Sequence, residues 1–97
     1  GALTLQTSDG HTLAADLTEP AGPPRGGVAV CHPHPLYGGN RFHPIVDAVF
    51  RAAPAVGLRA VRFDFRADHA DGVGEGHDVV AALDAVALDD LPVFVVG

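Results

Sequence analysis

The chain has 97 residues, 47% of them apolar, and a formal net charge of −6 at pH 7. This length allows one small domain, and the apolar content is typical of a globular protein rather than a disordered one. The acidic balance argues against a nucleic-acid surface, and because every basic residue is an arginine, a P-loop lysine or a Schiff-base lysine is excluded.

Cysteine content and hydropathy bear on the compartment. Cys31 is the only cysteine, which excludes an internal disulfide and favours a reducing compartment. The chain has no run of about 20 apolar residues and no basic-then-apolar leader before Leu3, so neither a membrane span nor a signal peptide is predicted. We therefore expect a cytoplasmic protein without a membrane partner.

The first third of the chain predicts a hairpin and a buried strand. Residues 3–5 and 12–17 are β-type runs that flank Ser8-Asp9-Gly10, and an Asp-Gly pair in that position indicates a hairpin. Residues 20–27 are rich in proline and glycine and predict a surface connection. Val28–Cys31 is wholly apolar, which is typical of a strand covered on both faces.

A helix and a second strand are predicted next. Proline is favoured at the first helical position, so Pro44 marks the helix start. Pro54 is expected to distort or end the last turn, and Gly57 to cap it. Leu58–Phe65 then predicts a strand. The apolar face of the helix is predicted to consist of Ile45, Val46, Val49, Phe50 and Ala53.

The last third predicts a loop, a helix and a final strand. Residues 67–76 are polar and rich in glycine, and Val93–Val96 is a short apolar strand. The predicted helix between them has Glu75 and Asp78 near its N-terminus, which is the positive end of the helix dipole. This alternation predicts the α/β class, with a mostly parallel sheet and helices on both faces, in one domain over residues 1–97. The apolar helix residues are Val79, Val80, Leu83, Val86 and Ala87.

The segment Cys31–Asn40 lies where open α/β sheets place their ligand sites, after a strand and before a helix. One interpretation is an oxyanion-hole loop, because His34 has a backbone N–H while the prolines on either side of it have none. A second is a zinc site from Cys31, His32, His34 and His43, but their spacing matches no recognised ligand pattern, and we predict no metal. In a third, the prolines and glycines only route the chain.

Other polar patterns favour structural interpretations. Gly72–Gly76 departs from the dinucleotide fingerprint because His77 stands where the third glycine is needed, so we predict a flexible turn. Arg66 is expected to pair with Asp64 or another nearby carboxylate. The acidic residues Asp64, Asp68, Asp71 and Glu75 lack the spacing of an EF-hand, which favours a solvated loop.

Three segments together resemble the N-terminal half of small bacterial serine hydrolases of the α/β-hydrolase superfamily. They are His-Pro-His-Pro-Leu-Tyr-Gly-Gly-Asn at 32–40, Arg-Phe-Asp-Phe-Arg at 62–66 and Val-Phe-Val-Val-Gly at 93–97. The resemblance implies the α/β-hydrolase fold with strand order 1-2-4-3-5, truncated after the fifth strand. Relatives have Arg-Gly-x-Gly-x-Ser where this chain has Arg-Ala-Asp-His-Ala-Asp from Arg66, so their substrates do not carry over.

The resemblance also implies residue roles. The backbone N–H of His34 would be an oxyanion donor, and Tyr37, Gly38 and Gly39 would bind substrate, with Tyr37 either lining the acyl pocket or covering the loop. Gly97 would open a Gly-x-Ser-x-Gly turn, with the serine, the acid and the catalytic histidine beyond it. The residues Ser8, His69 and His77 correspond to no position of that triad.

The predicted function is serine-dependent hydrolysis of an ester or related acyl bond in the intact protein, without a cofactor. The expected partner is a small-molecule acyl substrate, and a homo-oligomer is left open. The alternative is a non-catalytic binding or assembly domain with the same fold, which the residue two positions after Gly97 would distinguish. Because Val93–Val96 would form an apolar sheet edge, the 97-residue chain alone is expected to aggregate, swap or stay partly unfolded.

Overall fold

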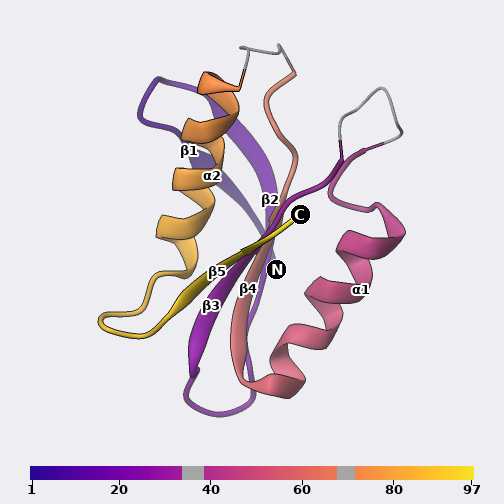
Figure 1. Cartoon of the computed structure of the whole chain (residues 1–97), viewed down its shortest axis with the longest axis vertical. Coiled ribbons are helices and arrows are strands. Elements are labelled where there is room, and N and C mark those ends of the chain that lie inside the picture. Colours follow the sequence, from indigo (N-terminus) through magenta and orange to yellow (C-terminus); the bar gives the residue numbers. More distant parts are fainter. Residues whose placement is uncertain (34–38, 68–71) are drawn as a thin grey trace.

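Five strands form one mixed sheet in the computed structural model, which describes residues 1–33, 39–67 and 72–97 (Figure 1). The strand order is β1-β2-β4-β3-β5; β1 and β2 run antiparallel to their neighbours, whereas β4, β3 and β5 are parallel. This is the order that the resemblance implied. The strands are β1 (Ala2–Gln6), β2 (Thr12–Thr18), β3 (Gly26–Val30), β4 (Leu58–Phe63) and β5 (Val93–Val96).

Helices cover both faces of this sheet, as predicted (Figure 1). The helix α1 (Pro44–Ala52) continues into a 3₁₀ turn, η2 (Ala53–Val56), on one face, and α2 (Val73–Val86) lies on the other. Alternation along β3 feeds both cores: Val28 and Val30 pack in the cluster with α1, and Ala29 packs in the cluster with α2. A strand buried on both faces explains why its sequence is wholly apolar.

The ends of α1 follow from local chemistry. The side-chain Nδ1 of His43 accepts a hydrogen bond from the N–H of Ile45 at 3.2 Å, and Pro44 occupies the first turn. Gly57, at φ 83°, ends η2 in the left-handed conformation, as the predicted cap requires. The apolar face is narrower than predicted, because Ile45 is exposed while Val46 is buried.

The start of α2 corrects the sequence interpretation. Gly72, at φ 87°, turns the chain into a helix that begins at Val73, so Gly74 and Gly76, predicted to form a flexible turn, belong to the helix. The buried stripe also differs, since Val80 is exposed. Three of the four buried residues are small or polar, and the helix lies close to β3, where a Cβ on Gly27 would collide with the Val86 carbonyl. That stripe consists of Gly74, Asp78, Ala82 and Val86.

Two strand ends matter for the site. The strand β4 ends at Phe63 rather than at the predicted Phe65, because the Phe65 N–H bonds a histidine side chain instead of a neighbouring strand. At the sheet edge, the four residues of β5 are between 37% and 51% exposed, which confirms an apolar edge. Within the ranges described, no helix has the length and hydropathy needed to cross a membrane.

Candidate active site

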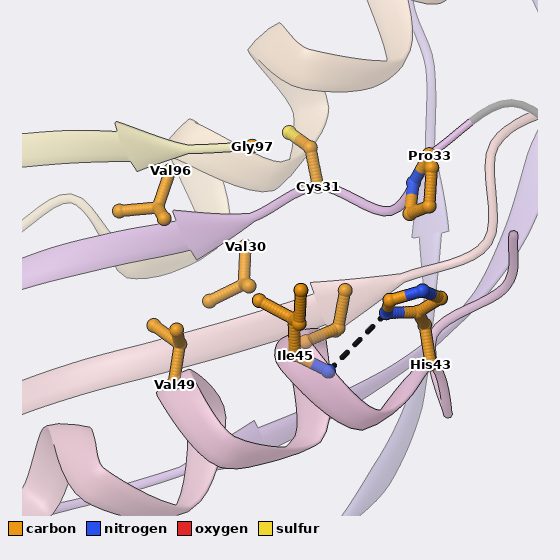
Figure 2. A pocket seen from close by; sticks show the side chains of 9 residues that line it. Val30, Cys31, Pro33, His43, Ile45, Val49, Val96 and Gly97 are labelled. Atoms are coloured by element: carbon orange, nitrogen blue, oxygen red, sulfur yellow. Dashed lines mark hydrogen bonds between the residues drawn. The ribbon is translucent and has the colours of Figure 1, made fainter.

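A cavity of about 350 Å³ opens at the carboxyl ends of β3 and β5, against the first turns of α1 (Figure 2). This is the position at which open α/β sheets bind their ligands. The walls are almost entirely apolar, which suits the hydrocarbon part of a substrate. The lining residues are Val30, Cys31, Pro33, His43, Ile45, Val46, Val49, Val96 and Gly97.

Gly97 lies directly beside Cys31 at this cavity (Figure 2). The Cys31 N–H donates to the Val96 carbonyl at 2.7 Å, which extends the β3–β5 pairing by one residue. A Cβ built on Gly97 would lie only 2.7 Å from the Cys31 Cβ. A glycine is therefore required at the point where the chain leaves β5.

The Cys31 thiol is unsuited to be a nucleophile. Burial raises its pKa to about 11, so it stays protonated at neutral pH. Its neighbours at the cavity are apolar, apart from His43, whose Nδ1 is occupied by the cap of α1. The cavity wall thus contributes shape rather than a reactive sulfur.

A buried histidine, His32, lies at the start of the segment that follows β3. His32 is 8% exposed, and its ring meets Phe65 edge to face at 5.1 Å between centroids. Its Nε2 accepts from the Phe65 N–H at 3.0 Å, so the proton of the neutral ring lies on Nδ1 and donates to the Pro33 carbonyl at 2.5 Å. With both nitrogens occupied, His32 is not available to a metal.

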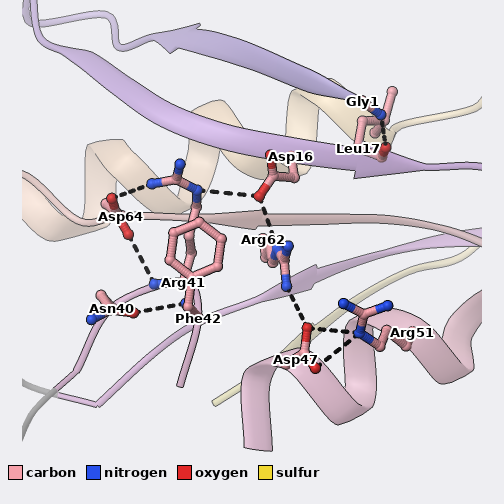
Figure 3. Close-up of polar contacts among 10 residues, drawn as sticks. All are labelled: Gly1, Asp16, Leu17, Asn40, Arg41, Phe42, Asp47, Arg51, Arg62 and Asp64. Atoms are coloured by element: carbon pink, nitrogen blue, oxygen red, sulfur yellow. Dashed lines mark hydrogen bonds and ion pairs between the residues drawn. The ribbon is translucent and has the colours of Figure 1, made fainter. Parts of the chain in front are cut away.

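Arg41 lies at the other end of this segment, just before α1 (Figure 3). The Arg41 backbone N–H donates to one oxygen of Asp64 at 2.8 Å, and its guanidinium donates to the other at 2.5 Å. Its Nε also donates to Asp16 at 3.2 Å. Asn40 completes this turn, since its side-chain oxygen accepts from the Phe42 N–H at 2.8 Å.

A shared carboxylate extends this network across the sheet (Figure 3). Asp16 on β2 accepts from both Arg41 and Arg62, the latter at 2.9 Å, and Arg62 also donates to Asp47 on α1 at 2.7 Å. Burial opposes ionisation of Asp16, but the hydrogen bonds from Arg62 and Arg41 outweigh it, and its pKa is lowered. The Phe42 ring stacks beneath both guanidinium groups.

The predicted site residues divide between described and undescribed parts. His34, Tyr37 and Gly38 lie outside the described residues. Gly39 is described, and a Cβ there would collide with the Pro33 carbonyl, so the two ends of the segment touch at this glycine. The zinc interpretation gains no support, since the described residues contain no cluster of three or more ligand-type side chains.

Arg66 pairs with carboxylates other than the one predicted first. It donates to Asp78 through its backbone N–H, Nε and Nη2 at 2.8–3.0 Å, and to Asp9 through both terminal nitrogens. Asp78 is fully buried, whereas Asp64 binds Arg41. Arg66 therefore joins the β1–β2 turn to α2 and does not line the cavity.

Ser8 and His77 come together although neither was predicted to be catalytic. The Ser8 hydroxyl lies 3.2 Å from His77 Nδ1, in an exposed contact between the β1–β2 turn and α2. Neither residue lines the cavity at Gly97. The sequence analysis did not predict that His32 and Arg41 anchor the segment between β3 and α1. The signal in the sequence was the Asp-Phe pair within Arg62–Arg66, because these two residues are their partners.

Solved structures of α/β hydrolases resemble this chain in fold and in sequence. The chain is similar to an α/β serine hydrolase homologue from Coxiella burnetii, with 30% identity, a TM-score of 0.84, and coverage of 98% of this chain and 50% of that one. The chain has the α/β-hydrolase fold. The match supports the α/β-hydrolase superfamily, and the chain spans about half the length of the structures it matches.

Two further structures show the same likeness. An α/β serine hydrolase without a lid from Xanthomonas campestris has 29% identity and a TM-score of 0.76 over 89% of this chain and 43% of that one. A putative α/β hydrolase from Agrobacterium tumefaciens has 26% identity and a TM-score of 0.80 over 89% and 42%. No family model and no curated protein matches the sequence.

Proposed function

We propose that the full-length protein is a serine-dependent hydrolase of an ester or related acyl bond. The observation that carries this proposal is the position of Gly97, at the carboxyl end of β5 and beside an apolar cavity. The α/β-hydrolase fold presents its nucleophile on a Gly-x-Ser-x-Gly turn at such a strand end. Structures with this fold and similar sequence are named serine hydrolases, which supports the same chemistry here.

In this mechanism the serine two positions after Gly97 attacks the substrate carbonyl. A histidine from the remainder of the protein takes the serine proton and later returns it to the leaving group, while an acidic residue orients that histidine. The backbone N–H of His34 stabilises the oxyanion, and Tyr37, Gly38 and Gly39 contact the substrate. The reaction proceeds without a cofactor, on a small acyl substrate, in the cytoplasm.

Replacement of that serine by alanine in the full-length protein tests the proposal. We expect hydrolysis of p-nitrophenyl acetate and butyrate to fall by at least about 10³-fold, because the residual machinery of such enzymes retains little activity. Ser8→Ala is the matched control and should keep wild-type activity, since Ser8 is the only serine in these 97 residues and lies away from the cavity. Full activity in the first variant would refute the proposal.

A further inference from the structure

We propose that His32 and Arg41 are paired positioning residues, which hold the two ends of the segment between β3 and α1 on consecutive residues after β4. His32 binds the Phe65 backbone and Arg41 binds Asp64. The eight residues between His32 and Arg41 are thus held at both ends by two adjacent residues, Asp64 and Phe65. The inference rests on the proposed function, which assigns an oxyanion donor to this segment.

The first anchor is directional. The backbone N–H of Phe65 points at Nε2 of His32, so this nitrogen must be unprotonated and Nδ1 must carry the proton. That proton bonds the Pro33 carbonyl and so sets the orientation of the next peptide. Edge-to-face packing on Phe65 restricts rotation of the ring. A buried ring with these contacts fixes both the position and the direction of the chain that leaves β3.

The second anchor is ionic and also directional. Two donors from one residue, the Arg41 N–H and its guanidinium, meet the two oxygens of Asp64. Asp64 is itself tied to β2, because its N–H donates to the Ala14 carbonyl at 2.9 Å. The Arg41 side chain is 20% exposed, so solvent screens this pair less than a fully exposed one. Arg41 therefore holds the C-terminal end of the segment against the chain that follows β4.

Contact between the two ends closes the arrangement. Gly39 lies so close to the Pro33 carbonyl that any side chain would collide with it, and its Cβ position would also lie 2.9 Å from His32 Nδ1. Gly39 thus packs against the Pro33 carbonyl, the same group that accepts the hydrogen bond from His32. An oxyanion donor works only if it is held where charge develops, and a misplacement of about 1 Å can cost roughly 10²-fold in rate.

The experiment measures kcat and KM of the full-length protein on p-nitrophenyl butyrate for four variants. His32→Leu and Arg41→Met should each lower kcat by roughly 10- to 100-fold with KM changed less than about threefold, because the transition state is affected more than substrate binding. His32→Gln keeps an acceptor for the Phe65 N–H and should recover part of the loss. Arg59→Met removes a similar bidentate pair, with Glu19, from the far end of β4 and should leave kcat unchanged.

The double variant of His32→Leu and Arg41→Met adds a test of pairing. If both residues hold one segment, the combined loss in kcat is smaller than the product of the two single losses. A combined loss equal to that product would show two independent roles and overturn the pairing. If both single variants keep kcat within twofold, the positioning role is wrong, although the proposed function would stand provided the serine variant is inactive.

A spectroscopic measurement covers the case in which His32→Leu fails to fold. Long-range ¹⁵N–¹H NMR of the full-length protein reports which nitrogen of His32 is protonated. We expect the proton on Nδ1; a proton on Nε2 would remove the Phe65 contact and contradict the inference. Activity of a serine-to-alanine variant separates the two claims, since its retention defeats the proposed function whatever the state of His32.

Discussion

Two arginine networks, both tied to the chain after β4, hold different parts of the molecule. Arg66 is 3% exposed in its side chain and bonds the fully buried Asp78 and the half-exposed Asp9, which joins α2 to the β1–β2 turn. Arg41 is more exposed and bonds Asp64 after β4 and Asp16 on β2. Residues two positions apart, Asp64 and Arg66, therefore belong to networks on opposite sides of the sheet.

The two networks differ in how much stability the protein would lose if their ion pairs were removed. Loss of Asp78 leaves the buried Arg66 guanidinium with Asp9 as its one remaining carboxylate partner, at the more exposed end of the network, which is strongly destabilising. Loss of the Arg41 contacts exposes charges that water can solvate, so stability changes less. We therefore expect Arg66 to contribute mainly to stability and Arg41 mainly to the geometry of the candidate site.

The largest predicted effect is that of Asp78→Asn on stability. The substitution leaves the Arg66 guanidinium with a neutral amide in a site without solvent, and we expect the midpoint of thermal unfolding to fall by roughly 10 °C. Differential scanning calorimetry of the full-length protein measures it. Asp84→Asn, at an exposed position of the same helix, should change the midpoint by less than about 2 °C. An Arg41→Met variant as unstable as Asp78→Asn would remove the contrast.

The acid sensitivity of the Arg66 network gives the second prediction. Hydrogen bonds from Arg66 and then Thr7 hold the pKa of Asp9 well below its ordinary value. A carboxylate with a lowered pKa stabilises the fold at any pH above its unfolded pKa of about 4, and this contribution is lost as the pH falls through the folded value. Asp9→Asn should therefore lower the unfolding midpoint at pH 7 and flatten its decline between about pH 5 and pH 2.5. A decline as steep as that of the wild type would show that Asp9 is not the group responsible.

The smallest predicted effect is on the alkylation rate of Cys31, which lines the cavity. Its pKa of about 11 keeps the thiol protonated, so alkylation by iodoacetamide at pH 8 should be slow in the folded protein. Arg41→Met should raise the alkylation rate several-fold by loosening the chain beside β3, whereas Arg59→Met should not. Mass spectrometry at timed intervals gives both rates. Equal rates in the two variants would mean that Arg41 does not restrain this region.

Much of the fold could be predicted because its signals are local. The Asp-Gly turn, the apolar run of β3, and Pro44 with Gly57 each specify one element through backbone chemistry. The strand order came from the resemblance, and the sheet topology confirms it. These features do not depend on which side chains meet across the molecule.

The remainder depends on contacts that periodicity does not reveal. The start of α2 was missed because its glycines suggest a turn, while close packing on β3 favours small residues there. Arg66 pairs with carboxylates, as predicted, but Asp64, the first candidate because it is nearest in sequence, is not among them; the packing of α2 brings Asp78 to it instead. His32 and Arg41 were not predicted as anchors since their partners lie 33 and 23 residues away.

The most direct test of the central claim is fluorophosphonate labelling of the full-length protein, followed by peptide mapping of the adduct. We expect one adduct, on the serine two positions after Gly97, because Gly97 lies at the carboxyl end of β5 beside the apolar cavity. Labelling should be lost when that serine is replaced by alanine and retained in Ser8→Ala. An adduct on Ser8, or no adduct in folded protein, would contradict the assignment of serine hydrolase chemistry to this site.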